Sequence, residues 1–147
     1  MSRIADYRRT LHEMPADRWD AYLASNSHLP GPRGNIELAL AVAEEAPPEV
    51  LRRYAASEDE FEAVCGAVGL GRLLADGDEY VAADLRELAA DRRWRVREGV
   101  AMGLQRLGDA DPGRLVATCR RWLEDASWLV QRAVIAGICE PRLLDGP

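Results

Sequence analysis

The strongest constraint on the fold of this chain is a pattern of residues that recurs after 34 positions. The first copy contains Asp91, Trp94, Val96, Val100, Gly103 and Leu104, and the second contains Asp125, Trp128, Val130, Val134, Gly137 and Ile138. A fixed period of this length is typical of a helix–turn–helix unit stacked along an α-solenoid, in which each unit contacts its neighbours. The pattern therefore predicts an all-α fold.

Helical periodicity extends over most of the chain, and no stretch shows the alternation expected of a strand. Helices are predicted near 2–13, 16–25, 35–46, 48–56, 58–74, 79–90, 94–107, 112–124 and 128–139. Their connections are short, so consecutive helices are expected to pack as antiparallel neighbours. We expect one domain, 1–147, with an N-terminal helix pair and its loop over 1–34 and the repeats over 35–147.

Several residues mark where these helices begin and end. The expected helix starts are a capping box of Ser57 with Glu60, Asp111 followed by Pro112, and Ser127. Gly108 is expected to end helix 94–107, which makes Leu107–Asp109 a turn, and Pro141 is expected to close the last helix. In helix 112–124 the predicted apolar face comprises Leu115, Val116, Cys119, Trp122 and Leu123.

The segment Asn26–Gly34 interrupts this pattern, because two prolines and two glycines in nine residues specify a turn. The turn leads into a helix N-terminus, where backbone amides favour negative charge. Arg33, Gly34 and Asn35 therefore form a candidate anion or contact loop, although geometry alone also explains a rigid turn here.

The stretch Leu85–Asp109 resembles the HEAT-repeat family. In that family an Asp ends one helix and a Val-Arg pair lies in the first turn of the next, as Asp91, Val96 and Arg97 do here. The resemblance implies a short right-handed α-α superhelix, a HEAT-like solenoid of about four helix pairs. It also implies a polar contact between Asp91 and Arg97, which the second copy alters because Gln131 replaces the arginine.

The stretch Arg121–Ile135 resembles the HEAT-like alkylpurine DNA glycosylases, in which a tryptophan and a nearby arginine face the DNA. Trp128 and Arg132 are the matching residues, and no aspartate matches the catalytic one of that family. HEAT-like repeats also occur in bilin-attachment proteins, where a Leu-Gly-Asp turn such as Leu107–Asp109 is common. The repeat specifies a fold more than a function.

Charge separates the possible partners. The net charge is −6, and residues 1–85 carry 8 Arg against 16 acids, whereas residues 86–147 carry 11 Arg against 9 acids. Overall acidity disfavours a nucleic-acid binder, whose affinity depends on clustered cations. The candidate nucleic-acid contacts are Arg93, Arg95 and Arg132, with Arg97 expected to be engaged by Asp91. A protein partner is therefore the favoured prediction, and DNA binding related to the glycosylases is the alternative.

A non-catalytic scaffold or adaptor is expected to bind that partner through its concave face, which the second helix of each pair lines in a HEAT-like stack. The candidate partner-binding residues are Arg114, Arg121, Trp128, Asp84 and Glu87. Thr118 shares the polar face of helix 112–124 with the two arginines. Trp94 and Trp128 fit two interpretations, either exposed platforms for stacking or aromatic packing between successive repeats.

No catalytic or metal-binding motif is present, because His12 and His28 fit no zinc spacing with any cysteine. Cys65, Cys119 and Cys139 are expected to be reduced core residues of a cytoplasmic protein. The sequence also lacks an apolar run that would span a bilayer. We therefore expect no cofactor, no metal and no membrane association, and an enzyme is less expected than a binding protein.

Overall fold

The computed structural model describes residues 2–139 of the chain. The helices are α1 (Arg3–Glu13), α2 (Trp19–Asn26), α3 (Ile36–Glu45), α4 (Pro48–Ala55), α5 (Glu60–Ala75), α6 (Ala82–Ala89), α7 (Trp94–Ala110), α8 (Pro112–Leu123) and α9 (Trp128–Ile138). Single 3₁₀ turns, Ala16–Arg18 and Glu79–Val81, lead into α2 and α6, and the described range contains no strand. The prediction of an all-α fold is therefore confirmed, and each predicted helix is present to within a few residues.

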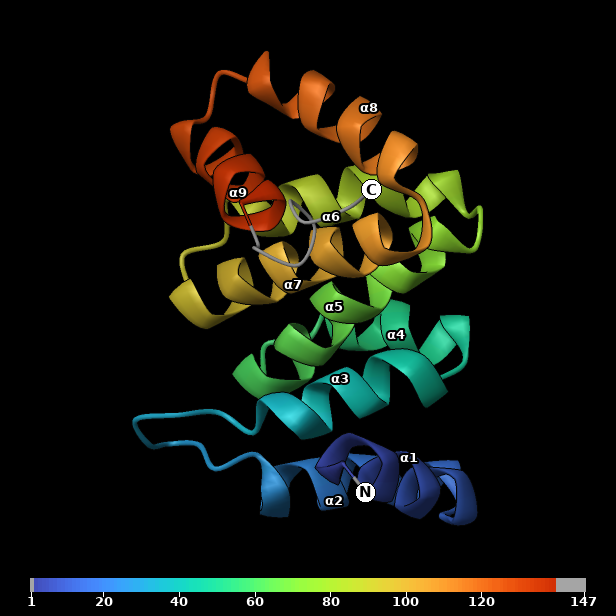
Figure 1. Ribbon diagram of the computed structural model, residues 1–147. Coiled ribbons are helices and arrows are strands. Elements are labelled where there is room, and N and C mark those ends of the chain that lie inside the picture. The colour runs from blue at the N-terminus through green and yellow to red at the C-terminus, as the bar shows by residue number, and fades with distance from the viewer. Residues whose placement is uncertain (1, 140–147) are drawn as a thin grey trace.

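The odd-numbered helices form a row in which each helix packs on the next, from α1 through α3, α5 and α7 to α9 (Figure 1). The even-numbered helices flank this row: α4 packs on α5, α6 on α7, and α8 on both α7 and α9. The N-terminal helices thus lie at one end of the stack and α8 and α9 at the other. Helix α5 lies in the middle, and most of its side chains are buried.

The period of 34 residues is also present in the backbone. Helices α5, α7 and α9 begin at Glu60, Trp94 and Trp128. Three residues before each start, the side chains of Ser57, Asp91 and Asp125 accept a hydrogen bond from the backbone N–H two residues further on, at 3.0, 2.8 and 2.8 Å. The same local turn therefore precedes α5, α7 and α9. The 34-residue recurrence thus includes the unit that begins with α5.

The predicted helix start is confirmed at Asp111 and corrected at α5, and Ser127 occupies the predicted N-cap position of α9. Asp111 accepts the N–H of Arg114 at 3.0 Å, and Pro112 follows it. At α5 the cap is Asp59, which accepts the N–H of Glu62 at 2.9 Å, whereas Ser57 lies outside the helix. Ser127 makes no capping hydrogen bond with its side chain. The Asp125 carboxylate accepts the N–H of Ser127 itself, at 2.8 Å, and not an N–H of the first turn of α9.

The predicted end of α7 at Gly108 is wrong. The helix continues to Ala110, and Gly108 is buried within it, so Leu107–Asp109 is helical and not a turn. Gly77, with a φ of 103°, is the described glycine that adopts the left-handed conformation, in the turn after α5. The expected effect of Pro141 on the last helix falls outside the described residues. A glycine in a helical context thus marks close packing more often here than a helix end.

Close packing of α5 on α7 depends on glycine. A Cβ atom at Gly71 would overlap the backbone carbonyl of Gly103. A Cβ atom at Gly103 would lie 2.8 Å from the carbonyl oxygen of Ala67. Because backbone atoms cannot move aside as a flexible side chain can, both positions exclude any larger residue without separating the two helices.

Arg72 joins α5 to the C-terminal end of α3. Its Nη1 atom donates to the carbonyl oxygens of Ala43 and Glu44 at 2.9 Å and to that of Ala46 at 3.0 Å. These carbonyls include helix-end acceptors that have no partner within α3, and a cation at a helix C-terminus is favourable. The arginine therefore serves as a side-chain cap supplied by the next helix of the row.

The buried face of α8 differs from the predicted one. Thr118 is buried together with Leu115, Cys119 and Trp122, whereas Val116 and Leu123 are 39% and 52% exposed. The predicted placement of Thr118 on the polar face is therefore wrong. The helix is rotated toward α7, so a residue of intermediate polarity faces the core and two aliphatic residues face away from it.

Two of the three cysteines lie in the core as predicted. Cys65 and Cys119 are buried, and burial raises the pKa of the Cys65 thiol and raises that of Cys119 to about 11. Cys139 is exposed, so its predicted burial is wrong. The reason is that the position follows the last turn of α9, where no further described helix packs.

We predict that Gly71→Ala destabilises the chain. The overlap with the Gly103 backbone is expected to cost roughly 1–3 kcal/mol, more than the gain in helix propensity of about 1 kcal/mol. Urea unfolding should show a lower midpoint at unchanged m-value. Gly113→Ala in α8 is the matched control, because its Cβ would lie 3.5 Å from the nearest atom, an Asp111 oxygen, and should leave stability equal or higher. Equal stability of the two variants would contradict the proposed backbone contact.

Candidate functional site

One edge of the molecule gathers several features that suit binding. Helices α3, α5, α7 and α9 all begin at this edge, at the left of Figure 1, and the turn of residues 27–35 projects beside them. Because all four begin at this edge, the positive ends of their dipoles lie along the same side. We call this side the N-edge, defined by the turn 27–35 and the first residues of these four helices.

The N-edge contains a pocket of about 380 Å³ between the turn, α3, α5 and α7. The pocket is lined mainly by apolar side chains, with three charged residues among them. The lining residues are Leu29, Pro32, Arg33, Gly34, Asn35, Ile36, Ala39, Phe61, Val64, Trp94, Arg95, Glu98 and Met102. Its volume lies within the range of sites that bind small molecules or the anchoring side chains of a partner.

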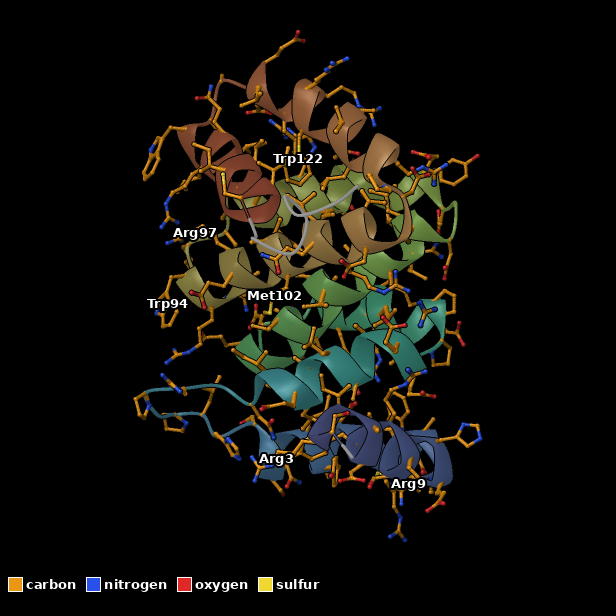
Figure 2. The ribbon with its side chains drawn as sticks, in the orientation of Figure 1. Arg3, Arg9, Trp94, Arg97, Met102 and Trp122 are labelled. Atoms are coloured by element: carbon orange, nitrogen blue, oxygen red, sulfur yellow. The ribbon has the colours of Figure 1, made fainter. Side chains whose placement is uncertain are left out.

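Trp94 forms part of the rim of this pocket. Its side chain projects from the start of α7 at the left of Figure 2, and the residue is 48% exposed. The guanidinium carbon of Arg95 lies 4.5 Å from the centre of the Trp94 ring, an arrangement that holds the indole in place by a cation–π interaction. A half-exposed aromatic side chain with a fixed orientation is a suitable contact residue.

Arg95 also attaches the turn to α7. Its Nη2 atom donates to the carbonyl oxygen of Gly31 at 2.7 Å, and its Nη1 atom lies 3.5 Å from a carboxylate oxygen of Glu60. The arginine thus links three segments that are far apart in the sequence and closes one wall of the pocket. Because these donors are engaged within the chain, Arg95 has little capacity left for a phosphate group.

Asn35 fixes the other end of the turn. Its side-chain oxygen accepts the N–H of Leu38 at 3.2 Å, and its amide donates to the Tyr7 hydroxyl at 3.0 Å and to the carbonyl of Asn26 at 2.9 Å. The residue is buried and its side-chain oxygen and amide both have partners, so it stabilises the turn and the start of α3. Arg33 is exposed and has no ion pair within residues 2–139, which leaves a free cation at the pocket.

Arg93 connects consecutive repeats. Its side chain pairs with the Asp91 carboxylate at 3.0 Å and donates to the carbonyls of Ser57 at 3.2 Å and Glu58 at 3.1 Å. The hydrogen bond from Arg93 is the main cause that lowers the pKa of Asp91. Arg93 is therefore a structural residue at the junction of α5 and α7, and its guanidinium is engaged within the chain.

The predicted contact between Arg97 and Asp91 exists, but it uses the backbone. Arg97 donates to the carbonyl oxygen of Asp91 at 2.7 Å, while Arg93 occupies the carboxylate. In the next unit Gln131 donates to the carbonyl oxygen of Asp125 at 2.8 Å. Since a neutral amide suffices for a carbonyl acceptor, the replacement of arginine by glutamine preserves this contact.

The five predicted partner-binding residues do not form one patch. Arg114 donates to the carbonyl of Leu74 at 2.7 Å and lies 3.4 Å from Glu79, so it links α8 to the end of α5. It lies in the first turn of α8, whereas Trp128 follows the C-terminal end of that helix, which is about 13 Å from Arg114 along the axis. Arg121 is exposed without a partner within the described range.

Asp84 and Glu87 lie on the other side of the row. With Arg52 they border a small hollow of about 170 Å³ between α4 and α6. Arg52 is paired with Asp78, which leaves both acidic residues without a described partner. This hollow is smaller than the pocket of the N-edge.

Trp128 belongs to the N-edge. It is the first residue of α9, 68% exposed, and thus equivalent to Trp94 in the repeat. The interpretation of these tryptophans as buried packing between repeats is not what the structure shows. Arg132 is also exposed and has no ion pair within residues 2–139. The N-edge therefore combines two exposed indoles with free arginines.

Phe61, Met102 and Ile36 are pocket residues that sequence reasoning missed. Their helical periodicity indicated only that they lie on apolar faces of helices. The pocket forms because the turn folds over helices that follow it by 30 to 65 residues in the sequence, and Arg95 holds it there. The one available signal was the unusual composition of residues 26–34.

Comparison of the chain with protein families, with curated proteins and with solved structures finds no match in any of the three. Within residues 2–139, no group of three or more His, Cys, Asp or Glu side chains is arranged to hold a metal ion. None of the helices in that range has the length and apolarity required to cross a membrane. The geometry of the N-edge is therefore the basis for a functional proposal.

We predict that Asp91→Asn lowers stability at neutral pH by about 1 kcal/mol, because it removes the ion pair with Arg93. The folded-state pKa of Asp91 is below its unfolded value of about 3.9, so the contribution is complete above that value. It is lost as the pH falls through the folded-state pKa. Urea unfolding of both proteins should therefore show a stability difference at pH 7 that shrinks below about pH 4.

Glu124→Gln is the control for this pH series, since Glu124 is exposed and makes no side-chain contact within the described range. Its stability should follow that of the unmodified chain at every pH. A constant difference between Asp91→Asn and the unmodified chain down to pH 2.5 would show that the ion pair is not the cause.

Proposed function

We propose that this chain is a non-catalytic helical-repeat adaptor of HEAT-like type that binds a protein partner. We also propose that its helices form a short right-handed solenoid. The recurrence of helix starts, of the preceding turns and of the carbonyl contacts of Arg97 and Gln131 supports this architecture. Repeat proteins of this kind act mainly by presenting an extended surface.

The observation that carries the binding function is the apolar pocket of about 380 Å³ beside a half-exposed tryptophan and a free arginine. Binding energy between proteins is concentrated in a few aromatic and arginine residues, commonly around pockets that receive an apolar anchor. Trp94 and Arg33 supply these residue types, and Phe61 and Met102 supply an apolar floor. We therefore assign partner binding to the N-edge.

The proposed binding surface is the N-edge and not the concave face that the sequence pattern predicts. Arg114 is engaged by the end of α5, and Asp84 and Glu87 border only a small hollow. Trp128 is the predicted binding residue that lies on the proposed surface. Protein binding is favoured over DNA binding because Arg93 and Arg95 donate to groups of the chain itself.

The test is quantitative affinity capture from a lysate of the source cells with the unmodified chain and three variants. Trp94→Ala removes the rim of the pocket, and Ile36→Asp introduces charge at a residue that is 49% exposed and lines it. Tyr80→Ala is the matched control, because Tyr80 is 91% exposed and lies in the turn after the C-terminal end of α5, away from the N-edge. We predict that one set of proteins is retained by the unmodified chain and Tyr80→Ala and reduced at least about tenfold by the other two.

Equal capture by all variants would contradict the proposed surface, provided that circular dichroism shows each variant folded. A parallel titration of labelled duplex DNA at low and moderate salt tests the alternative. Tight binding that weakens steeply with salt and with Arg132→Ala would replace the protein-binding proposal by a nucleic-acid one.

A further inference from the structure

Each internal helix of the row is covered by the next one through a recurring set of positions. On α5, Ala67 faces α7, since a Cβ atom at Gly99 would lie 3.2 Å from the Ala67 Cβ atom. On α7, Gln105 donates to the carbonyl of Ala136 in α9 at 3.4 Å. Ala67, Ala101 and Ile135 follow one another at intervals of 34 residues and are 0%, 8% and 61% exposed. The position that holds a buried alanine in α5 and α7 thus holds a large, exposed residue in α9.

The flanking helices show the same change. Ala89 of α6 is buried, whereas Leu123, its equivalent in α8, is 52% exposed. Ala82 packs against the core, and its equivalent Val116 is 39% exposed. Small covered residues are therefore replaced by larger aliphatic ones at the end of the stack. We call the surface of Val116, Leu123, Ile135 and the neighbouring Arg120 the terminal face.

Within the described residues, Arg120 on this face also lacks the ion pair that the equivalent arginine of α6 makes. Arg86 of α6 pairs with Asp125, which lies in the turn that leads into α9. Arg120 occupies the equivalent position on α8, is exposed, and has no ion pair or hydrogen bond within residues 2–139. Arg86 thus pairs with an aspartate that lies just before α9, whereas the equivalent Arg120 on α8 is an unpaired cation within that range.

The surface of α1, at the other end of the row, carries polar side chains in place of exposed aliphatic ones. The outer residues of α1 are polar, and among them Arg9 pairs with Asp6 at 2.7 Å and Arg8 with Glu45 at 2.6 Å. No large hydrophobic residue is exposed between residues 2 and 35. The outer surface of α1 is therefore polar, whereas the terminal face exposes aliphatic side chains.

We propose that the terminal face binds a helix of a partner protein, an amphipathic helix preceded by an aspartate or glutamate that pairs with Arg120. A helix is the expected occupant because α9 covers α6 and α7, which are the equivalents of α8 and α9 in the preceding unit. The acid is expected because Arg86 has one at the equivalent position. A second copy of the same face is a poor match, since Arg120 is the unpaired charge of this face in the described part of the chain and a second copy would offer it no acid.

The test uses a peptide of residues 124–138 of this chain as the probe, acetylated, amidated and labelled with fluorescein. This segment is α9 with Asp125, the helix that covers the equivalent surface of the preceding repeat. Binding to the intact chain is followed by fluorescence anisotropy. We predict saturable binding, weakened roughly three- to fivefold by Arg120→Ala and unchanged by Arg121→Ala, its neighbour on the same helix. Ile135→Asp should weaken binding about tenfold or more.

The peptide variant Asp125→Ala separates the ion pair from general electrostatic attraction. It should bind the unmodified chain as weakly as the original peptide binds Arg120→Ala, with no further loss when the two changes are combined. Absence of saturable binding, or equal effects of Arg120→Ala and Arg121→Ala, would overturn the proposal. Loss caused by Arg86→Ala alone would also overturn it, because the peptide would then be replacing α9 on its own site. A dimer that sedimentation detects and Ile135→Asp abolishes would assign the face to a second copy instead.

Discussion

The backbone contact between α5 and α7 is the constraint on which the rest of the structure depends. Gly71 and Gly103 allow the two helices to approach until main-chain atoms touch, so neither helix can rotate or slide without a collision. Helix α5 is buried on most of its surface, and this contact fixes the direction of the next unit. The position of α9 follows in turn, because Gly137 accommodates Leu104 of α7 closely, with its Cβ position 2.8 Å from the Leu104 Cβ atom.

Polar groups hold the units in register around this apolar contact. Arg72 caps the end of α3 from α5, Arg93 joins the start of α7 to the turn before α5, and Arg114 joins α8 to the end of α5. Each guanidinium donates to carbonyls of a neighbouring unit, including carbonyls at helix ends that have no partner within their own helix. The arginines of this acidic chain therefore serve largely as links between units. Three arginines that have no ion pair within residues 2–139 lie on the proposed surfaces: Arg33 and Arg132 on the N-edge and Arg120 on the terminal face.

The two proposed surfaces arise from different causes. The pocket of the N-edge exists because a turn rich in proline and glycine is held over α7 by Arg95. The terminal face exists because no further helix within residues 2–139 covers those positions of α8 and α9 whose equivalents in α6 and α7 are covered. The first surface is a departure from the repeat, and the second is a consequence of it. For this reason substitutions at one surface are expected to leave binding at the other unchanged.

The sequence by itself determined the helices and their period. Helical spacing of apolar residues, the cap at Asp111 and the interval between Trp94 and Trp128 are local properties, which depend on residues within one or two turns. Local signals failed where a neighbour supplied the missing interaction. Gly108 continues a helix because the surrounding core buries it.

Only the tertiary structure decided which side chains are available for binding. Arg93 and Arg95 resemble a basic cluster in the sequence, but their partners at residues 57, 58 and 31 lie more than 30 positions away. Val116 and Leu123 fit the apolar face of α8, yet they lie outside the core because the helix is rotated toward Thr118. The free energy of such contacts depends on the packing of distant segments, and periodicity within one helix contains no information on that packing.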